Sequence, residues 1–272
     1  MVGGLGNQLF QTAAILKYRR NKEKVIISFL GAIHIPKRGN CLNSIFEIPD
    51  WLYFDNSRKL DLLTKLFSRS SAALRFGSYL PLVGINDRNF NYKKSYFLNQ
   101  KLLFLDGYFN QNWNYIQLNS LFSILKLKPI KLNKAQLQIC NHNVVIHIRG
   151  GDFLQINNLN ICQFDYYKKT LEYFLSKGLK KFVVISEDQK YGKEVIKELK
   201  RYFLDIEISI MKSDSIENDF NMIRSSKLAI LSNSTFSWWA SFLSSSKKEF
   251  LVPSNFTIKE QRIQLPKETI IN

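Results

Sequence analysis

One stretch of the sequence changes from apolar to polar within a few residues, where a strand is expected to end. Residues 144–148 read Val-Val-Ile-His-Ile, and Arg149, Gly150, Gly151 and Asp152 follow directly. Such a run predicts a buried central strand of an α/β sheet, and ligands bind at the carboxyl ends of such strands. An arginine beside glycines suits an anion, because its planar fork matches phosphate oxygens and glycine lets backbone N–H groups approach. Spacing alone leaves an ordinary strand with a glycine turn as an open alternative.

A second polar stretch follows another apolar run. Residues 232–239 read Ser-Asn-Ser-Thr-Phe-Ser-Trp-Trp and open a predicted helix. Hydroxyl groups at a helix N-terminus can donate hydrogen bonds to phosphate oxygens, because the helix dipole is positive there. The alternative is that Ser234 or Thr235 only caps the helix, with Trp238 and Trp239 as core anchors. Asp219, on the helix before this strand, could accept a hydrogen bond from a guanine edge, although spacing alone favours a solvated helix carboxylate.

Glycines also precede a predicted helix near the start of the sequence. Gly3, Gly4 and Gly6 form a predicted loop, and apolar residues from Leu9 onward follow helical spacing. A glycine loop that leads into a helix N-terminus is an anion site by geometry. The dinucleotide-binding fingerprint fits poorly, because Leu9 replaces its third glycine and no acidic residue ends the predicted strand at 25–30. An NAD-dependent oxidoreductase is therefore the least favoured enzyme class.

The elements that must position these residues alternate regularly in the second half of the chain. Strands are predicted at 144–148, 181–186, 206–211, 228–231 and 249–252, with helices at 165–176, 191–203, 216–226 and 236–243. Such alternation indicates parallel βαβ units. Ser213 or Asp214 is the predicted cap of the third of these helices.

The first half of the chain is less regular. It predicts a short helix at 61–67, a strand at 102–109 and a helix at 113–125. Residues 126–132, which include Pro129, form a predicted linker between the two halves.

Composition limits the possible function classes. The chain has 272 residues, 45% of them hydrophobic, and a formal net charge of +17 that would attract a polyanion. Three isolated cysteines predict a reducing compartment, and three scattered histidines predict no zinc site. No apolar run approaches the ~18 residues that cross a bilayer. These features predict an intracellular protein whose basic surface could rest on an anionic membrane.

Three segments together resemble one enzyme family. Gly3-Gly4-Leu5-Gly6-Asn7-Gln8-Leu9-Phe10-Gln11, His147-Ile148-Arg149-Gly150-Gly151-Asp152 and the stretch at 232–239 are similar to the signature blocks of the α-1,2-fucosyltransferases, glycosyltransferase family 11. The resemblance implies an α/β fold of the GT-B type, with two Rossmann-like domains whose parallel sheets face a cleft. Residues 1–127 would be the acceptor-side domain and residues 128–272 the domain that binds GDP-fucose. The donor would react with inversion, without a metal or another cofactor.

The resemblance also implies roles for individual residues. Arg149 would hold the β-phosphate of the donor and stabilise the departing GDP. His147 would shape the guanosine pocket, Asp219 would bind guanine, and Ser234 and Thr235 would contact the pyrophosphate. Asp152 is the nearest candidate for a general base, or it braces Arg149. The residues expected to face the cleft from the first domain are Gly4, Gly6, Asn7 and Gln8.

Two departures from the family pattern bear on activity. Gly150 stands where the family has a second arginine, and the lost charge could weaken donor binding by roughly 1.5–3 kcal/mol. The family also has a strand before the first glycine loop, and this sequence does not show it, which would expose neighbouring strand edges.

The resemblance therefore implies a bacterial galactoside α-1,2-fucosyltransferase that builds O-antigen or another surface polysaccharide. It would be cytoplasmic and could lie peripherally on the inner face of the inner membrane. Its partners would be GDP-fucose and an oligosaccharide or lipid-linked glycan acceptor. Two alternatives are a catalytically impaired relative that binds GDP-sugar, suggested by Gly150, and a basic nucleic-acid-binding protein, suggested by the net charge. The second lacks a recognition motif, so nucleic acid is not an expected partner.

Overall fold

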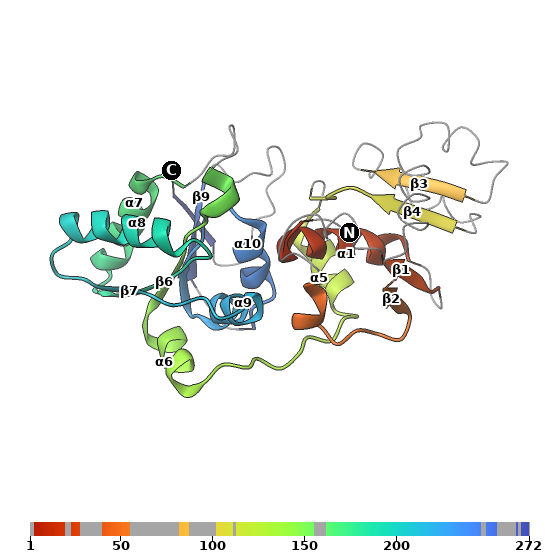
Figure 1. Cartoon of the computed structure of the whole chain (residues 1–272), viewed down its shortest axis with the longest axis horizontal. Coiled ribbons are helices and arrows are strands. Elements are labelled where there is room, and N and C mark those ends of the chain that lie inside the picture. Colours follow the sequence, from red (N-terminus) through yellow and green to blue (C-terminus); the bar gives the residue numbers. More distant parts are fainter. Residues whose placement is uncertain are drawn as a thin grey trace. The chain divides into compact units, whose positions relative to one another are not determined.

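The computed structural model divides into two compact units, Met1–Lys128 and Pro129–Asn272 (Figure 1). The predicted boundary at 127/128 differs from this division by one residue. The residues that the structure describes are 3–19, 23–27, 40–54, 82–86, 102–110, 113–154, 162–245, 249–254, 265 and 268–271. The predicted helix at 61–67 and the end of the predicted strand at 25–30 lie outside them.

The N-terminal unit is built around helix α1, Leu5–Tyr18, whose buried side chains include Leu9, Phe10, Ala13 and Ala14. Two short pairs of parallel strands accompany it: β1 (Val25–Ile27) with β2 (Leu52–Phe54), and β3 (Leu82–Asn86) with β4 (Leu102–Asp106). A short 3₁₀ turn η1 (Leu42–Ser44) and helix α5 (Tyr115–Phe122) complete its described elements.

The predicted glycine loop is shorter than expected. Helix α1 begins at Leu5, so Gly6 lies inside the helix and only Gly3 and Gly4 precede it. Gly3 has a φ of +80°, a backbone conformation that side chains rarely adopt, and Gly4 is the N-cap. The helix starts early because Gln8 makes two hydrogen bonds there. Its backbone N–H donates to the Gly4 carbonyl oxygen, and its side-chain Nε2 donates to the Gly3 carbonyl oxygen.

The C-terminal unit confirms the predicted parallel α/β organisation. Six parallel strands lie in the order β10-β9-β8-β5-β6-β7. Their bounds are β5 Val144–His147, β6 Lys181–Ile185, β7 Glu207–Ile210, β8 Leu228–Ile230, β9 Glu249–Pro253 and β10 Glu268–Ile271. The helices are α6 Lys134–His142, α7 Phe164–Ser176, α8 Gln189–Tyr202, α9 Ile216–Ser225 and α10 Thr235–Phe242, and the 3₁₀ turn η3 spans Gly151–Leu154. Helices α7 and α8 lie on one side of the sheet, and α9 and α10 on the other (Figure 1).

The strand order places a reversal beside β5. The chain runs from β5 outward through β6 and β7, then returns to the other side of β5 and runs outward through β8, β9 and β10. This is the order of a doubly wound Rossmann sheet, in which ligands bind at the carboxyl ends of the strands where the order reverses. Strand β5 is completely buried because both neighbours and both helix layers cover it. The polar stretches after β5 and β8 therefore meet at this reversal.

Sequence reasoning missed two elements of this unit. Helix α6 carries an Asn133–Gln136 capping box, which is a readable signal, but it buries only Gln136 and Cys140 and so lacks an apolar stripe. Strand β10 pairs with β9 at the edge of the sheet. The predicted cap of α9 was wrong by one residue, because Ser215 accepts the backbone N–H of Asn218.

Among the described helices, none is long and apolar enough to cross a membrane.

Candidate functional site

His147 joins the two polar stretches at the sheet reversal. It ends β5, and its Nδ1 shares a 2.7 Å hydrogen bond with the Oγ of Ser232, which follows β8. Its ring also lies against Phe236, with centroids 5.6 Å apart. Burial, together with the nearby charge of Arg149, lowers the pKa of His147 to about 3. The imidazole is therefore neutral near pH 7 and fixes the relative positions of β5 and β8.

Arg149 forms an ion pair with Glu187. The arginine side chain is 14% exposed, whereas that of Glu187 is 48% exposed, so the guanidinium is largely buried and its partner is open to solvent. Glu187 follows β6, the neighbour of β5, and therefore reaches the same edge of the sheet. Sequence reasoning missed Glu187, although its position just after a predicted strand was the signal that had singled out Arg149.

Gly150 is a packing position. It is buried, and a Cβ added to it would lie 2.8 Å from the Cβ of Asp188 and 3.1 Å from Cδ1 of Tyr191. Asp188 holds the adjoining loop, because its Oδ2 accepts the backbone N–H of Gly151 at 3.0 Å and its Oδ1 accepts that of Tyr191 at 3.0 Å. These two N–H donors lower the pKa of Asp188. The structure thus gives a steric reason for glycine at position 150. The sequence had indicated only the loss of a positive charge there.

Ser234 caps helix α10. Its hydroxyl accepts the backbone N–H of Phe236 at 3.3 Å, and Trp238 and Trp239 are buried in the core. The structure therefore confirms that Ser234 caps the helix and that the two tryptophans anchor the core, whereas a contact of Ser234 with a pyrophosphate stays a prediction. Thr235, the first residue of the helix, is partly exposed at the same positive helix end.

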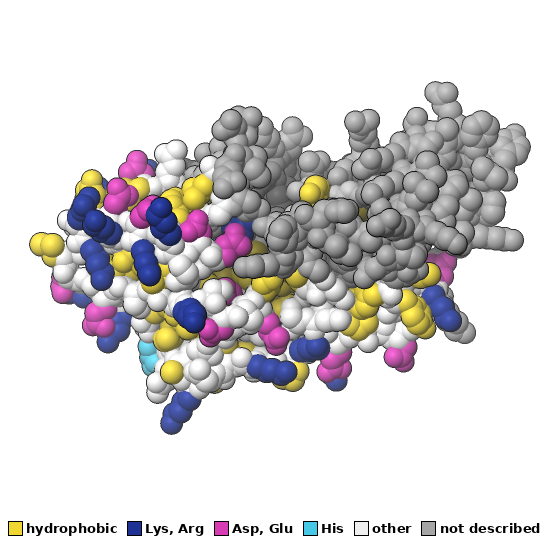
Figure 2. All heavy atoms as spheres, viewed as in Figure 1, with side chains coloured by type: hydrophobic (Ala, Val, Ile, Leu, Met, Phe, Trp, Pro, Cys, Tyr) yellow, Lys and Arg dark blue, Asp and Glu magenta, His cyan; other side chains and the backbone are white. Residues whose placement is uncertain are grey.

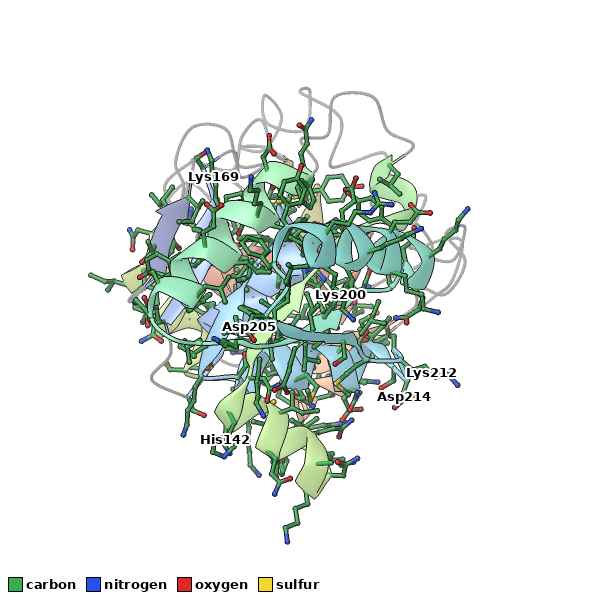
Figure 3. The ribbon with its side chains drawn as sticks, turned by 90° about the vertical axis from the view of Figure 1, so that its left-hand side faces the viewer. His142, Lys169, Lys200, Asp205, Lys212 and Asp214 are labelled. Carbon is green, nitrogen blue, oxygen red and sulfur yellow. The ribbon has the colours of Figure 1, made fainter. Side chains whose placement is uncertain are left out.

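Asp219 is not the solvated carboxylate that spacing favoured. It is 9% exposed and lies in the first turn of α9, where it accepts a hydrogen bond from the Ser213 hydroxyl at 2.5 Å. Burial raises its pKa to about 6, and the charges of Asp214 and Glu187 contribute. By contrast, Asp214 and Lys212 extend outward from the loop before α9 (Figure 3). Because the charge of Glu187 acts on Asp219, the buried carboxylate and Arg149 belong to one electrostatic group.

The four N-terminal residues that were predicted to face the donor lie in the other unit. Gln8 is fully buried, with its Nε2 donating to the Gly3 carbonyl oxygen at 3.1 Å and its Oε1 accepting the Cys41 backbone N–H at 3.0 Å. The Gln8 amide therefore braces the start of α1. Gly6 is also buried, whereas Gly4 and Asn7 are partly exposed. Their contacts with a donor stay predictions.

Asp152 lies in the 3₁₀ turn η3, and its side chain is outside what the structure describes. Glu187 is one described partner of Arg149, and the prediction that Asp152 also braces this arginine stays open. Among the described residues, no group of three or more His, Cys, Asp or Glu side chains could hold a metal ion.

Taken together, the edge of the sheet at the β5/β8 reversal offers chemistry for a nucleoside diphosphate. A guanidinium and the positive end of α10 can meet a pyrophosphate. A buried carboxylate at the start of α9 can accept N–H groups of a base. His147 and Ser232 hold the strands that carry these groups.

Comparisons with known proteins agree with this fold. Residues 85–270 match the family model described as glycosyl transferase family 11. The chain is 24% identical over 302 aligned positions to the O-antigen biosynthesis glycosyltransferase WbnK of Escherichia coli, with 99% of this chain and 98% of WbnK covered. It is 27% identical over 127 residues, 42% of each chain, to an alpha-1,2-colitosyltransferase of Escherichia coli.

Among solved structures, POFUT1 in complex with GDP-fucose is similar, with a TM-score of 0.52, 15% identity, and 95% and 96% of the two chains covered. The fold is thus the GT-B-like α/β architecture that the sequence predicted.

Proposed function

Because the chain belongs to glycosyltransferase family 11, we propose that it transfers L-fucose from GDP-fucose to the 2-hydroxyl of a terminal galactose-like sugar. The observation that carries this proposal is the grouping of Arg149, the α10 N-terminus and buried Asp219 at the sheet reversal. The reaction inverts the anomeric carbon, forms an α-linkage and requires no metal.

Arg149 is the residue that stabilises the leaving group. In the transfer, the bond between the anomeric carbon and the β-phosphate oxygen breaks, and its electron pair stays on GDP. A guanidinium at that oxygen offsets the developing negative charge, which is the main way a protein lowers such a barrier. Thr235 and the adjoining backbone at the start of α10 provide further donors for the pyrophosphate. Ser234 contributes to this site mainly as the helix cap.

Asp219 recognises the guanine. Its carboxylate accepts N–H groups of the base while it is ionised, and burial makes that interaction stronger than it would be in water. His147 lines the guanosine pocket as a neutral ring.

The acceptor is bound by the N-terminal unit, where Gly4 and Asn7 at the start of α1 are partly exposed and can contact a substrate. Asp152 is the proposed general base: it takes the proton of the acceptor hydroxyl as the new bond to the anomeric carbon forms. The reaction belongs to O-antigen or surface-polysaccharide synthesis, and the name of WbnK supports this assignment. The acceptor is an oligosaccharide or a lipid-linked glycan. The enzyme would work in the cytoplasm, peripherally on the inner membrane.

A transfer assay tests this function. The purified chain is incubated with GDP-fucose, and separately with a nucleotide-activated colitose because one relative is a colitosyltransferase, against a panel of galactosides with and without EDTA. We expect an α-1,2-linked fucosyl product that EDTA does not reduce. Arg149→Ala should lower kcat/KM by at least a hundredfold, whereas Lys200→Ala, an exposed lysine on α8, should have no effect (Figure 3).

Two results would replace the proposal. GDP binding without any sugar transfer would identify a catalytically impaired relative, as Gly150 suggested. Salt-sensitive nucleic-acid binding without GDP binding would instead favour the nucleic-acid-binding alternative.

A further inference from the structure

The small β1–β2 sheet of the N-terminal unit presents an apolar pair to solvent. Ile26 and Tyr53 are register partners in the two parallel strands, and they are 57% and 45% exposed. Their neighbours Ile27 and Leu52 are 3% and 7% exposed, so the opposite face of the sheet packs into the unit. Large apolar side chains paired on an open sheet face are uncommon in a monomer unless something covers them.

Cations and aromatic rings surround this pair. The guanidinium of Arg19 lies 3.9 Å from the centroid of the Trp51 ring, and Nζ of Lys24 lies 5.6 Å from that of Tyr53. Arg19 also donates from its Nε to the Glu23 carbonyl oxygen at 3.2 Å, which holds the guanidinium over the indole. We call the set Arg19, Lys24, Ile26, Trp51 and Tyr53 the β1–β2 patch.

The charge of the whole unit has the same sign as the patch. Residues 1–128 contain 18 lysines and arginines and 7 acidic residues, a net charge of +11 out of the +17 of the chain. Figure 2 shows hydrophobic side chains beside both basic and acidic ones on the described surface at its right-hand end. Such a surface attracts an extended anionic partner at long range, and its apolar side chains add contact energy at short range.

We propose that the β1–β2 patch docks the enzyme on an anionic lipid bilayer. Tryptophan and tyrosine with adjacent lysine and arginine suit the headgroup level, where the rings are half immersed and the cations meet lipid phosphates. Stable attachment of a peripheral protein takes both an apolar and an electrostatic contribution, and the patch supplies both. Nucleic acid would use the cations but leave Ile26 without a role. The inference rests on the proposed function in one respect, because a lipid-linked acceptor lies in that membrane.

Vesicle flotation with the full chain tests the docking. The vesicles contain phosphatidylglycerol and phosphatidylethanolamine, and neutral phosphatidylcholine vesicles serve for comparison. We expect binding to the anionic vesicles that weakens in 0.5 M salt. Ile26→Ser combined with Tyr53→Ser should lower the partition coefficient about tenfold, and Lys24→Glu about three- to tenfold.

Matched variants on the other unit provide the control. Leu204→Ser removes an apolar side chain that is 93% exposed, and Lys200→Glu reverses an exposed lysine, and neither should change vesicle binding. GDP affinity and the thermal unfolding midpoint, measured in solution, should be the same for all variants. These two measurements separate failure of docking from failure of the proposed function or of folding.

Three outcomes would overturn the docking proposal. The first is equal binding to anionic and neutral vesicles, and the second is equal loss in the patch and control variants. The third is a self-association of the chain that the Ile26 and Tyr53 substitutions abolish without changing vesicle binding, because a second copy would then cover the patch.

Discussion

The guanidinium of Arg149 is paired with the carboxylate of Glu187, a residue from the neighbouring strand's carboxyl end. The arginine proposed to bind the donor phosphate thus already has an anionic partner. The half-exposed carboxylate competes with any second anion, and its charge also reaches Asp219. Glu187 therefore acts on both ends of the proposed nucleotide site.

Replacing Glu187 by glutamine should tighten GDP binding. The change removes a negative charge beside the phosphate site and keeps the size of the side chain. Because partly exposed ion pairs contribute up to about 1 kcal/mol, we expect up to about a fivefold lower Kd at low salt and a smaller effect at high salt. Isothermal titration with GDP, at low and at high salt, measures the Kd under each condition. Asp205→Asn, which removes an exposed carboxylate paired with Lys180 on the α8–β7 loop (Figure 3), should leave the Kd unchanged. Weaker binding by the Glu187 variant would show that Glu187 orients Arg149 instead.

Replacing Asp219 by asparagine should stabilise the fold and weaken GDP binding. Burial raises the pKa of Asp219 to about 6, above its value in an unfolded chain, so ionisation of this group in the folded protein costs free energy. The cost is absent below about pH 4, grows through pH 6 and is complete above it. Asp219→Asn should therefore raise the free energy of unfolding by about 1–3 kcal/mol at pH 8 and leave it unchanged at pH 4.

Urea unfolding at the two pH values measures this difference, and GDP titration measures the functional loss. We expect the GDP affinity of the unmodified chain to fall as the pH drops below 6, because protonation of the Asp219 carboxylate removes a hydrogen-bond acceptor for the guanine N–H groups. The exposed neighbour Asp214, changed to asparagine, should retain GDP binding. If Asp219→Asn bound GDP as tightly as the unmodified chain, Asp219 would have no part in guanine recognition.

Replacing Gly150 by alanine should destabilise the C-terminal unit. A methyl group at this position would lie 2.8 Å from the Asp188 Cβ, and the collision would push apart the loops after β5 and β6. Overpacking of this kind costs about 1–3 kcal/mol. Thermal unfolding should show a lower midpoint for Gly150→Ala than for Gly4→Ala, where nothing lies within 4 Å of the added Cβ. Gly150→Arg, which restores the family pattern, should not improve GDP affinity, because the larger side chain meets the same steric conflict. An improved affinity would show that the missing positive charge is the main effect of Gly150.

Much of the fold followed from local sequence. The apolar run before His147 and the regular alternation of strands and helices predicted the parallel sheet of the C-terminal unit, because each buried strand must be apolar on both faces. The same residues marked Arg149 and the start of α10, since side chains that follow buried strands reach one edge of the sheet. Helix α6 and strand β10 did not follow, because each buries too little surface to leave a periodic pattern.

The sequence by itself determined which residue types stand at the ends of β5 and β8, and the resemblance that these residues carry. Only the tertiary structure decided what each side chain meets. It paired Arg149 with Glu187, linked His147 to Ser232, buried Asp219 and packed Gly150 against Asp188. The three pairs join residues that follow different strands, and the burial of Asp219 depends on how α9 packs on the sheet. The order of strands sets these separations, and no local pattern encodes that order.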